Sequence, residues 1–147
     1  LMADNSATAY DPENIFAKIL KGEIPCQKLY EDDDTLAFLD IMPRTEGHAL
    51  VITKEPAADL FAITPEGLGK LMTVVQTLAP KIKQAVGADG VLIQQFNGAA
   101  AGQTVFHLHV HIVPRKADVP MRPEAAKMAD PEDLKATAKK IRAVLSA

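Results

Sequence analysis

The sequence contains no tryptophan, only one cysteine and no long apolar run. The last two features argue against a disulfide-stabilised protein and a membrane-spanning protein. The single thiol, Cys26, has no partner for an internal disulfide, so a disulfide framework is excluded and a reducing compartment is expected. No apolar run approaches the ~18 residues that a membrane-spanning helix needs, and the pattern of a signal peptide is missing. These features predict a cytoplasmic protein with no membrane partner.

Basic residues are also scarce. The chain has 16 Lys and Arg against 19 Asp and Glu, a net charge of -3, so it lacks the basic surface that is typical of a general nucleic-acid binder. We therefore expect no nucleic-acid partner. The composition is otherwise that of a globular protein, with 48% hydrophobic and 24% charged residues, and 147 residues suffice for one domain with a sizeable core.

Capping residues predict three helices. Each begins with Asp or Thr followed directly by Pro, which is typical of an N-cap and the first helical position. The three pairs are Asp11–Pro12, Thr64–Pro65 and Asp130–Pro131. Gly22 and Gly87 mark the expected ends of the first two helices, and Pro80 should kink or split the second.

The remaining apolar segments predict five short strands. Residues 27–41 contain two of them around an acidic turn at 32–34, and the others lie within 47–53, 90–97 and 104–114. Several of these strands are close enough in sequence to form hairpins. The order helix, three strands, helix, two strands, helix therefore favours an α+β fold, an antiparallel sheet with helices on one face.

The segment HLHVHIVPR, residues 107–115, carries three of the four histidines at every second position. On a strand, His107, His109 and His111 share one face. The other face should be core, formed by Phe106, Leu108, Val110 and Ile112. A half-exposed strand, a metal site and a pH switch are alternative interpretations of the histidine row. Catalysis is favoured, because neutral imidazole is a good nucleophile toward phosphorus and a good acid or base near pH 7.

The loop before this strand favours a phosphate ligand. Small residues at 98–102 leave room for close approach and expose backbone N–H groups, although a plain hairpin turn is the alternative. Asn97, Gln103 and Thr104 add three neutral polar side chains beside the histidines.

These motifs resemble the histidine triad (HIT) family, whose signature is His-x-His-x-His followed by two apolar residues. Residues 14–55 are similar to its nucleoside phosphoramidase branch, and residues 102–116 are also similar to its diadenosine polyphosphate hydrolase branch. The resemblance covers 13–116, between a flexible N-terminus at 1–12 and a C-terminal extension with a helix at 117–147. It implies a five-stranded antiparallel sheet with two main helices plus the C-terminal helix, in a homodimer that forms one ten-stranded sheet.

The resemblance also implies a role for each candidate residue. His109 would attack the α-phosphorus of a nucleotide, with its other ring nitrogen held by the carbonyl of His107. His111 would bind the phosphate oxygens, and the His107 side chain would line the same pocket. Further phosphate ligands would be Asn97, Gln103 and Thr104. Asp40 would accept the ribose hydroxyls. The base pocket would comprise Ile15, Phe16, Ile19, Phe38, Leu39 and Ile41, of which the first three are equally well explained as core.

No metal and no cofactor are expected. Zinc-binding members have a Cys-x-x-Cys pair near the first helix, whereas this chain has Asn14 and Ala17 at those positions. His48 is then expected to be a hydrogen-bonded core histidine or a support for the triad.

The function implied by the resemblance is hydrolysis of nucleoside 5′-phosphoramidates through a nucleotidyl-histidine intermediate. The partner would be a purine nucleotide such as AMP or a nucleoside phosphoramidate. Two alternatives stay open: a diadenosine polyphosphate hydrolase, and a nucleotide-binding or signalling module with little turnover.

Overall fold

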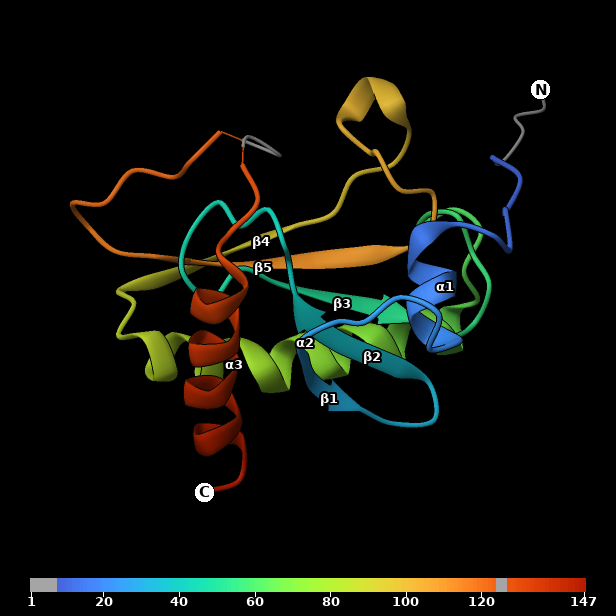
Figure 1. Cartoon of the computed structure of the whole chain (residues 1–147). Coiled ribbons are helices and arrows are strands. Elements are labelled where there is room, and N and C mark those ends of the chain that lie inside the picture. The colour runs from blue at the N-terminus through green and yellow to red at the C-terminus, as the bar shows by residue number, and fades with distance from the viewer. Residues whose placement is uncertain (1–7, 124–126) are drawn as a thin grey trace.

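The computed structural model describes residues 8–123 and 127–147, which form one five-stranded antiparallel sheet with three helices (Figure 1). The strands are β1 Lys28–Glu31, β2 Thr35–Leu39, β3 Ala49–Thr53, β4 Gly90–Gln94 and β5 His109–Arg115, in the order β1-β2-β3-β5-β4. The helices are α1 Ile15–Leu20, α2 Pro65–Val86 and α3 Pro131–Leu145, with a short 3-10 helix at Ala99–Ala101. The predicted α+β class and the antiparallel sheet are confirmed.

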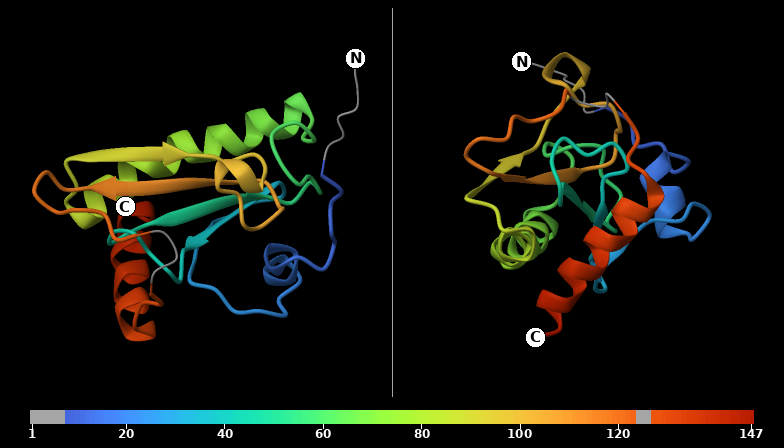
Figure 2. Two further views of the ribbon diagram at one scale, coloured as in Figure 1. Left: turned by 90° about the horizontal axis from the view of Figure 1, so that it is seen from above. Right: turned by 60° about the vertical axis from the view of Figure 1, so that its left-hand side comes forward.

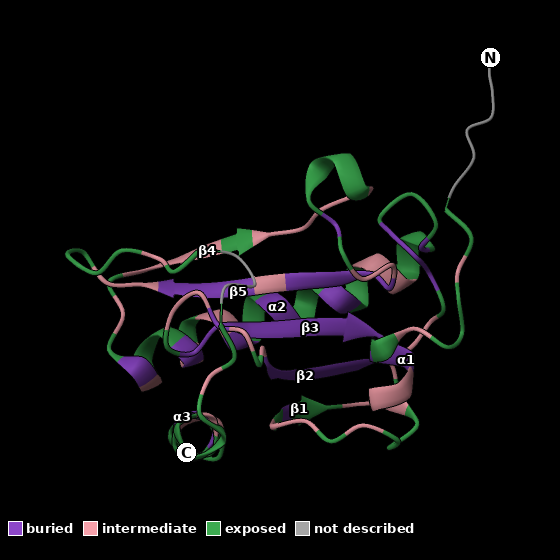
Figure 3. Cartoon of the chain, turned by 45° about the horizontal axis from the view of Figure 1, so that its top comes forward, coloured by how far each residue is buried: buried purple, intermediate pink, exposed green. Residues whose placement is uncertain are grey.

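The main core lies between the sheet and α2, with α3 packed beside α2. Its α2 residues recur every three or four positions, so one face of the helix meets the sheet. They include Leu71, Val75, Leu78 and Ile82. Ile141 of α3 and Leu108, Val110 and Ile112 near the triad belong to the same core. Figure 3 shows the burial concentrated in β2, β3 and β5, the three inner strands.

Helix α1 packs on the opposite face, so the prediction of helices on one face was wrong. Phe16 forms a second apolar cluster with Leu36 and Phe38 of β2 and Leu50 and Ile52 of β3. The right-hand view of Figure 2 shows α1 and α2 on opposite sides of the strands. The reason is visible in β2 and β3, which are apolar at every position except Thr35 and Thr53 and are buried throughout. A strand without polar alternation needs cover on both faces.

Two helix predictions need correction. Helix α1 starts after Asn14, whose Oδ1 accepts a hydrogen bond from Ala17 N at 2.9 Å. The expected cap, Asp11, instead accepts from Glu13 N in a separate turn. Helix α2 runs without interruption through Pro80, so the predicted split does not occur, although its caps Thr64 and Gly87 are confirmed.

The histidine strand is shorter than predicted. It begins at His109, so His107 and Leu108 lie just before it. Phe106 is half-buried and lies outside both core clusters, contrary to prediction. Leu108, Val110 and Ile112, predicted on the same face, are confirmed as core. Of the expected flexible N-terminus, residues 1–7 lie outside the described part of the chain.

The C-terminal extension passes over the β2–β3 loop before α3. Arg122 N donates to Arg44 O at 2.8 Å, and Ala129 N donates to Ile41 O at 2.9 Å. The predicted cap of the last helix, Asp130, is confirmed. Among the described residues, no helix is both long and apolar enough to cross a membrane.

Candidate active site

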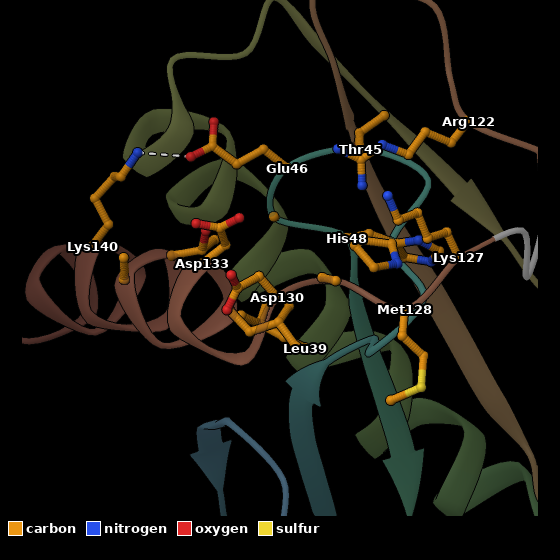
Figure 4. A pocket seen from close by; sticks show the side chains of 16 residues that line it. Leu39, Thr45, Glu46, His48, Arg122, Lys127, Met128, Asp130, Asp133 and Lys140 are labelled. Carbon is orange, nitrogen blue, oxygen red and sulfur yellow. Dashed lines mark hydrogen bonds and ion pairs between the residues drawn. The ribbon is translucent and has the colours of Figure 1, made fainter.

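A cavity of about 360 Å³ lies on the α1 face of the sheet. Predicted residues that line it are the apolar Ile15, Phe16, Ile19, Phe38, Leu39 and Ile41 and the polar Asp40, Thr104, His109 and His111. Sequence reasoning missed further lining residues: Ile24, Pro25, Cys26, Met42, Arg44, Leu50 and Val105. A larger cavity of about 770 Å³, which shares Leu39 and His48 with the first, lies between the β2–β3 loop and α3 (Figure 4).

His109 is held with one ring nitrogen toward the protein. Its Nδ1 lies 2.6 Å from the carbonyl oxygen of His107, which confirms the expected contact. A carbonyl only accepts, so the proton of neutral His109 is on Nδ1 and the lone pair is on Nε2. Burial lowers the pKa of His109 to about 4, so the ring is neutral at pH 7. These are the properties of a nucleophile.

His111 has the opposite tautomer, which is set by His48. The backbone N–H of Arg44 donates to His48 Nδ1 at 3.1 Å, so the proton of His48 is on Nε2. That Nε2–H lies 2.9 Å from His111 Nδ1, which must accept it. The proton of His111 is therefore on its own Nε2. Burial lowers the pKa of both rings, that of His48 to about 4, and the nearby Arg44 contributes.

The two neighbouring rings of β5 thus offer complementary groups. His109 carries a lone pair on Nε2 and His111 carries an N–H on Nε2, with ring centroids 5.0 Å apart. One group can attack an electrophilic atom, and the other can donate to an oxygen attached to that atom. His48, expected as a core histidine or a support for the triad, serves as both.

His107 is fully buried and does not line the cavity. Its Nε2 donates to Thr53 O at 2.7 Å, and its Nδ1 faces Tyr10 Oη at 3.0 Å and Asn14 Nδ2 at 3.3 Å. No sequence pattern signals either contact on Nδ1, because the two partners precede His107 by 97 and 93 positions along the chain.

Asn97 and Gln103 also lie outside the lining of the cavity. Gln103 Oε1 accepts from Gly98 N at 2.7 Å, and its Nε2 donates to Ala58 O at 2.7 Å, so it braces the loop of small residues. Asn97 Oδ1 accepts from Leu60 N at 2.9 Å. Their contact with phosphate stays a prediction.

The cluster of Asp40, His48 and His111 has its candidate ligand atoms within 4.8 Å of one another, a spacing that could suit a metal ion. Its hydrogen bonds do not fit one. A histidine that binds metal through one nitrogen donates from the other, but His48 Nδ1 accepts from Arg44 N–H. The zinc positions known from the family that the sequence resembles do not fit either, because Asn14 and Ala17 offer no thiolate and Asn14 Nδ2 faces His107.

Comparison with known protein families gives a match to the HIT domain over residues 21–118. The chain is 45% identical over 101 residues to adenosine 5'-monophosphoramidase hnt1 of Schizosaccharomyces pombe, which covers 69% of this chain and 73% of that protein. It is 43% identical over 102 residues to adenylylsulfatase HINT3 of Arabidopsis thaliana, covering 69% of this chain. The match spans about half, 52%, of the Arabidopsis protein.

Solved structures show the same fold. A HIT-like protein from Bartonella henselae, described as involved in cell-cycle regulation, superposes with a TM-score of 0.86 at 46% identity, covering 92% of this chain and 99% of that one. A zinc-bound histidine triad family protein from Mycobacterium smegmatis has a TM-score of 0.80 at 36% identity, with coverage of 91% and 94%.

Proposed function

The chain belongs to the histidine triad (HIT) family, and we propose that within it this protein is a nucleotide hydrolase that cleaves nucleoside 5′-phosphoramidates. One observation carries the proposal. The bare Nε2 of His109 and the protonated Nε2 of His111 stand side by side at a cavity whose remaining lining is mostly apolar, with Asp40, Arg44 and Thr104 among its polar members. The S. pombe relative, named a monophosphoramidase, supports the choice of leaving group.

In the first step, Nε2 of His109 attacks the α-phosphorus. A P–N bond to the imidazole forms while the P–N bond to the departing amine breaks, and the amine leaves with a proton that the Thr104 hydroxyl can relay from solvent. The imidazole is then bonded at Nε2 and still protonated at Nδ1, so it carries a positive charge. The carbonyl of His107 accepts from Nδ1–H and stabilises that charge.

In the second step, water attacks the same phosphorus. The new P–O bond replaces the P–Nε2 bond, water releases one proton to solvent, and AMP leaves neutral His109 with its lone pair restored. His111 donates from Nε2 to a phosphate oxygen in both steps, and no change of its tautomer is needed.

The nucleotide would lie with its base among the apolar residues of α1 and β2. Asp40 is half-buried at the cavity, where its carboxylate can accept from the ribose hydroxyls. We expect a purine base, because a two-ring base buries more apolar surface against these residues than a pyrimidine.

We also propose that the protein is a homodimer. β4 is an edge strand of the sheet, and Ile93 on it is 41% exposed. Met72 on the adjacent face of α2 is 40% exposed and lines the same shallow groove as Ile93. An edge strand beside an apolar groove is a surface that a second copy can cover.

A second leaving group merits testing because the Arabidopsis relative is named an adenylylsulfatase. The test of function is to incubate the purified chain with adenosine 5′-monophosphoramidate, adenylyl sulfate and diadenosine tetraphosphate, and to follow AMP release. His109→Ala is the control and should bind AMP without turnover. The fastest substrate identifies the leaving group, and absence of turnover of all three by the wild type would favour the nucleotide-binding module.

A further inference from the structure

His107 is the member of the triad that faces away from the cavity, yet its ring is the most completely hydrogen-bonded of the three. Its side chain is 0% exposed, and both ring nitrogens have partners. Nε2 donates to Thr53 O, so Nδ1 of the neutral ring can only accept. Tyr10 Oη and Asn14 Nδ2 are the donors placed there.

The part of His107 that meets the nucleophile is its carbonyl, 2.6 Å from His109 Nδ1. This peptide lies before the first residue of β5, so the ladder that aligns His109 with Ile52 does not include it. The N–H of the same peptide, on Leu108, donates to Ala57 O at 2.8 Å and orients it from one side, and the held His107 side chain orients it from the other. The ring is fixed by Thr53 on one side and by Tyr10 and Asn14 on the other.

Asn14 connects this arrangement to the wall of the cavity. Its Oδ1 caps α1 by accepting from Ala17 N, while its Nδ2 faces His107. Phe16, two residues later, packs edge-on against the His107 and His109 rings, at 6.1 and 4.9 Å between centroids. The helix that would contact the base and the residue that aims the nucleophile are thus held by one side chain.

We infer that Tyr10 and Asn14 are positioning residues for His109: by donating to His107 Nδ1 they fix the carbonyl that holds the nucleophile. The inference rests on the proposed function for its kinetic consequences only. Among the described residues, Tyr10 is the titratable side chain hydrogen-bonded to the His107 ring, and His109 contacts the His107 carbonyl. The Asn14 Nδ2 donor facing Nδ1 disfavours a second proton there, so it also helps to keep His107 uncharged beside the nucleophile.

The first test is Tyr10→Phe, which keeps the ring that packs edge-on against His107 at 5.4 Å and removes only the hydroxyl. We expect kcat for AMP release to fall about tenfold with KM within about twofold, because only the aim of the nucleophile changes. Tyr30→Phe is the matched control, since the Tyr30 hydroxyl donates to Asp32 on the far hairpin. It should leave kcat and KM unchanged.

The second test is Asn14→Asp, which keeps an oxygen to cap α1 and replaces the Nδ2 donor with an acceptor. The pKa of His107, followed by NMR of its ring, should rise by about one unit or more because a carboxylate then faces Nδ1. The melting temperature should stay close to that of the wild type while kcat falls. Lys18→Gln lowers the charge of α1 by the same unit and should change neither the His107 pKa nor kcat.

A readout independent of substrate separates this inference from the proposed function. The His109 Nδ1–H proton, hydrogen-bonded at 2.6 Å, should give a downfield NMR signal that shifts or broadens in Tyr10→Phe and not in Tyr30→Phe. An unchanged signal together with unchanged kcat would overturn the inference. A wild type that turns over no substrate would overturn the proposed function, and the NMR comparison would still decide the inference.

Discussion

His48 Nε2 lies 2.9 Å from Nδ1 of His111, and this pair determines which nitrogen of His111 carries its proton. The backbone N–H of Arg44 donates to His48 Nδ1, and His48 Nε2–H donates to His111 Nδ1. This chain of hydrogen bonds leaves the proton of His111 on its Nε2. A residue outside the signature motif therefore fixes the proton that the motif presents to phosphate.

His48→Ala should lower kcat for AMP release about 10- to 100-fold, because His111 Nδ1 loses its donor and the ring can turn or change tautomer. It should also destabilise the fold by about 1 kcal/mol, since the partly buried Arg44 N–H is left without its acceptor. His48→Gln can accept from Arg44 and donate to His111, and should recover part of both losses. Steady-state kinetics and urea unfolding measure the two effects. Wild-type kcat in folded His48→Ala would contradict the tautomer argument.

The activity of the free enzyme should persist to unusually low pH for a histidine nucleophile. Burial lowers the pKa of His109 to about 4, so its Nε2 lone pair is present above that pH and lost as the pH falls through it. We expect kcat/KM for a substrate that does not titrate itself to be flat from about pH 8 to about pH 5. A fall centred near the ordinary histidine pKa, about 6.5, would show that His109 is more solvated than the structure indicates.

Stability should begin to fall at a higher pH than activity, again because burial lowers the histidine pKa values. The pKa values of His48, His107, His109 and His111 are all lowered, mainly by burial, so the unfolded chain binds protons near pH 6.5 that the folded chain refuses. The contribution of the four histidines to the free energy of unfolding is then complete above about pH 6.5. It decreases as the pH falls toward about 4, with a slope of about 1.4 kcal/mol per pH unit for each histidine. Urea unfolding at several pH values measures it. A stability independent of pH between 7 and 5 would contradict the lowered pKa values.

The sequence predicted the sheet, α2 and α3 because these follow from local patterns, whereas most of the residues that line the cavity were expected from the family resemblance. The apolar stripe of α2 and the caps Thr64 and Asp130 are readable within one segment. The continuous apolar run of β2 already indicated cover on both faces, so the position of α1 could have been inferred from TLAFL.

What the sequence could not predict depends on contacts between distant segments. The donor to His48 is the backbone of Arg44, and a backbone N–H has no residue-type signature. Tyr10 and His107 are 97 positions apart, and no periodicity links them. The Gln103 amide bridges the Gly98 and Ala58 backbones, a contact that no sequence pattern indicated, while its contact with phosphate stays a prediction.

The proposed dimer predicts that charge at the edge strand separates the subunits. Ile93→Glu places a carboxylate in the groove beside Met72, where a partner would have to bury it unpaired. We expect the mass measured by light scattering to fall from that of two chains to that of one. Val119→Glu, at a side chain that is 51% exposed on the C-terminal extension, is the control and should keep the wild-type mass. A monomeric wild type would contradict the dimer proposal directly.

The C-terminal extension should influence catalysis through the β2–β3 loop. Ala129 N donates to Ile41 O, Arg122 N donates to Arg44 O, and Lys140 pairs with Glu46 at 2.8 Å, so the loop that carries Asp40 and Arg44 is held at three points.

Ala129→Pro removes one of these donors, and we expect it to lower kcat/KM about tenfold by loosening the loop. Met128→Pro is the matched control, since the Met128 N–H makes no hydrogen bond to any residue in the described ranges 8–123 and 127–147. Steady-state kinetics should separate the two variants, with melting curves to verify that both are folded. Equal kcat/KM in the two variants would mean that the extension only covers the sheet, because a contact that positions Asp40 and Arg44 cannot be removed without a kinetic effect.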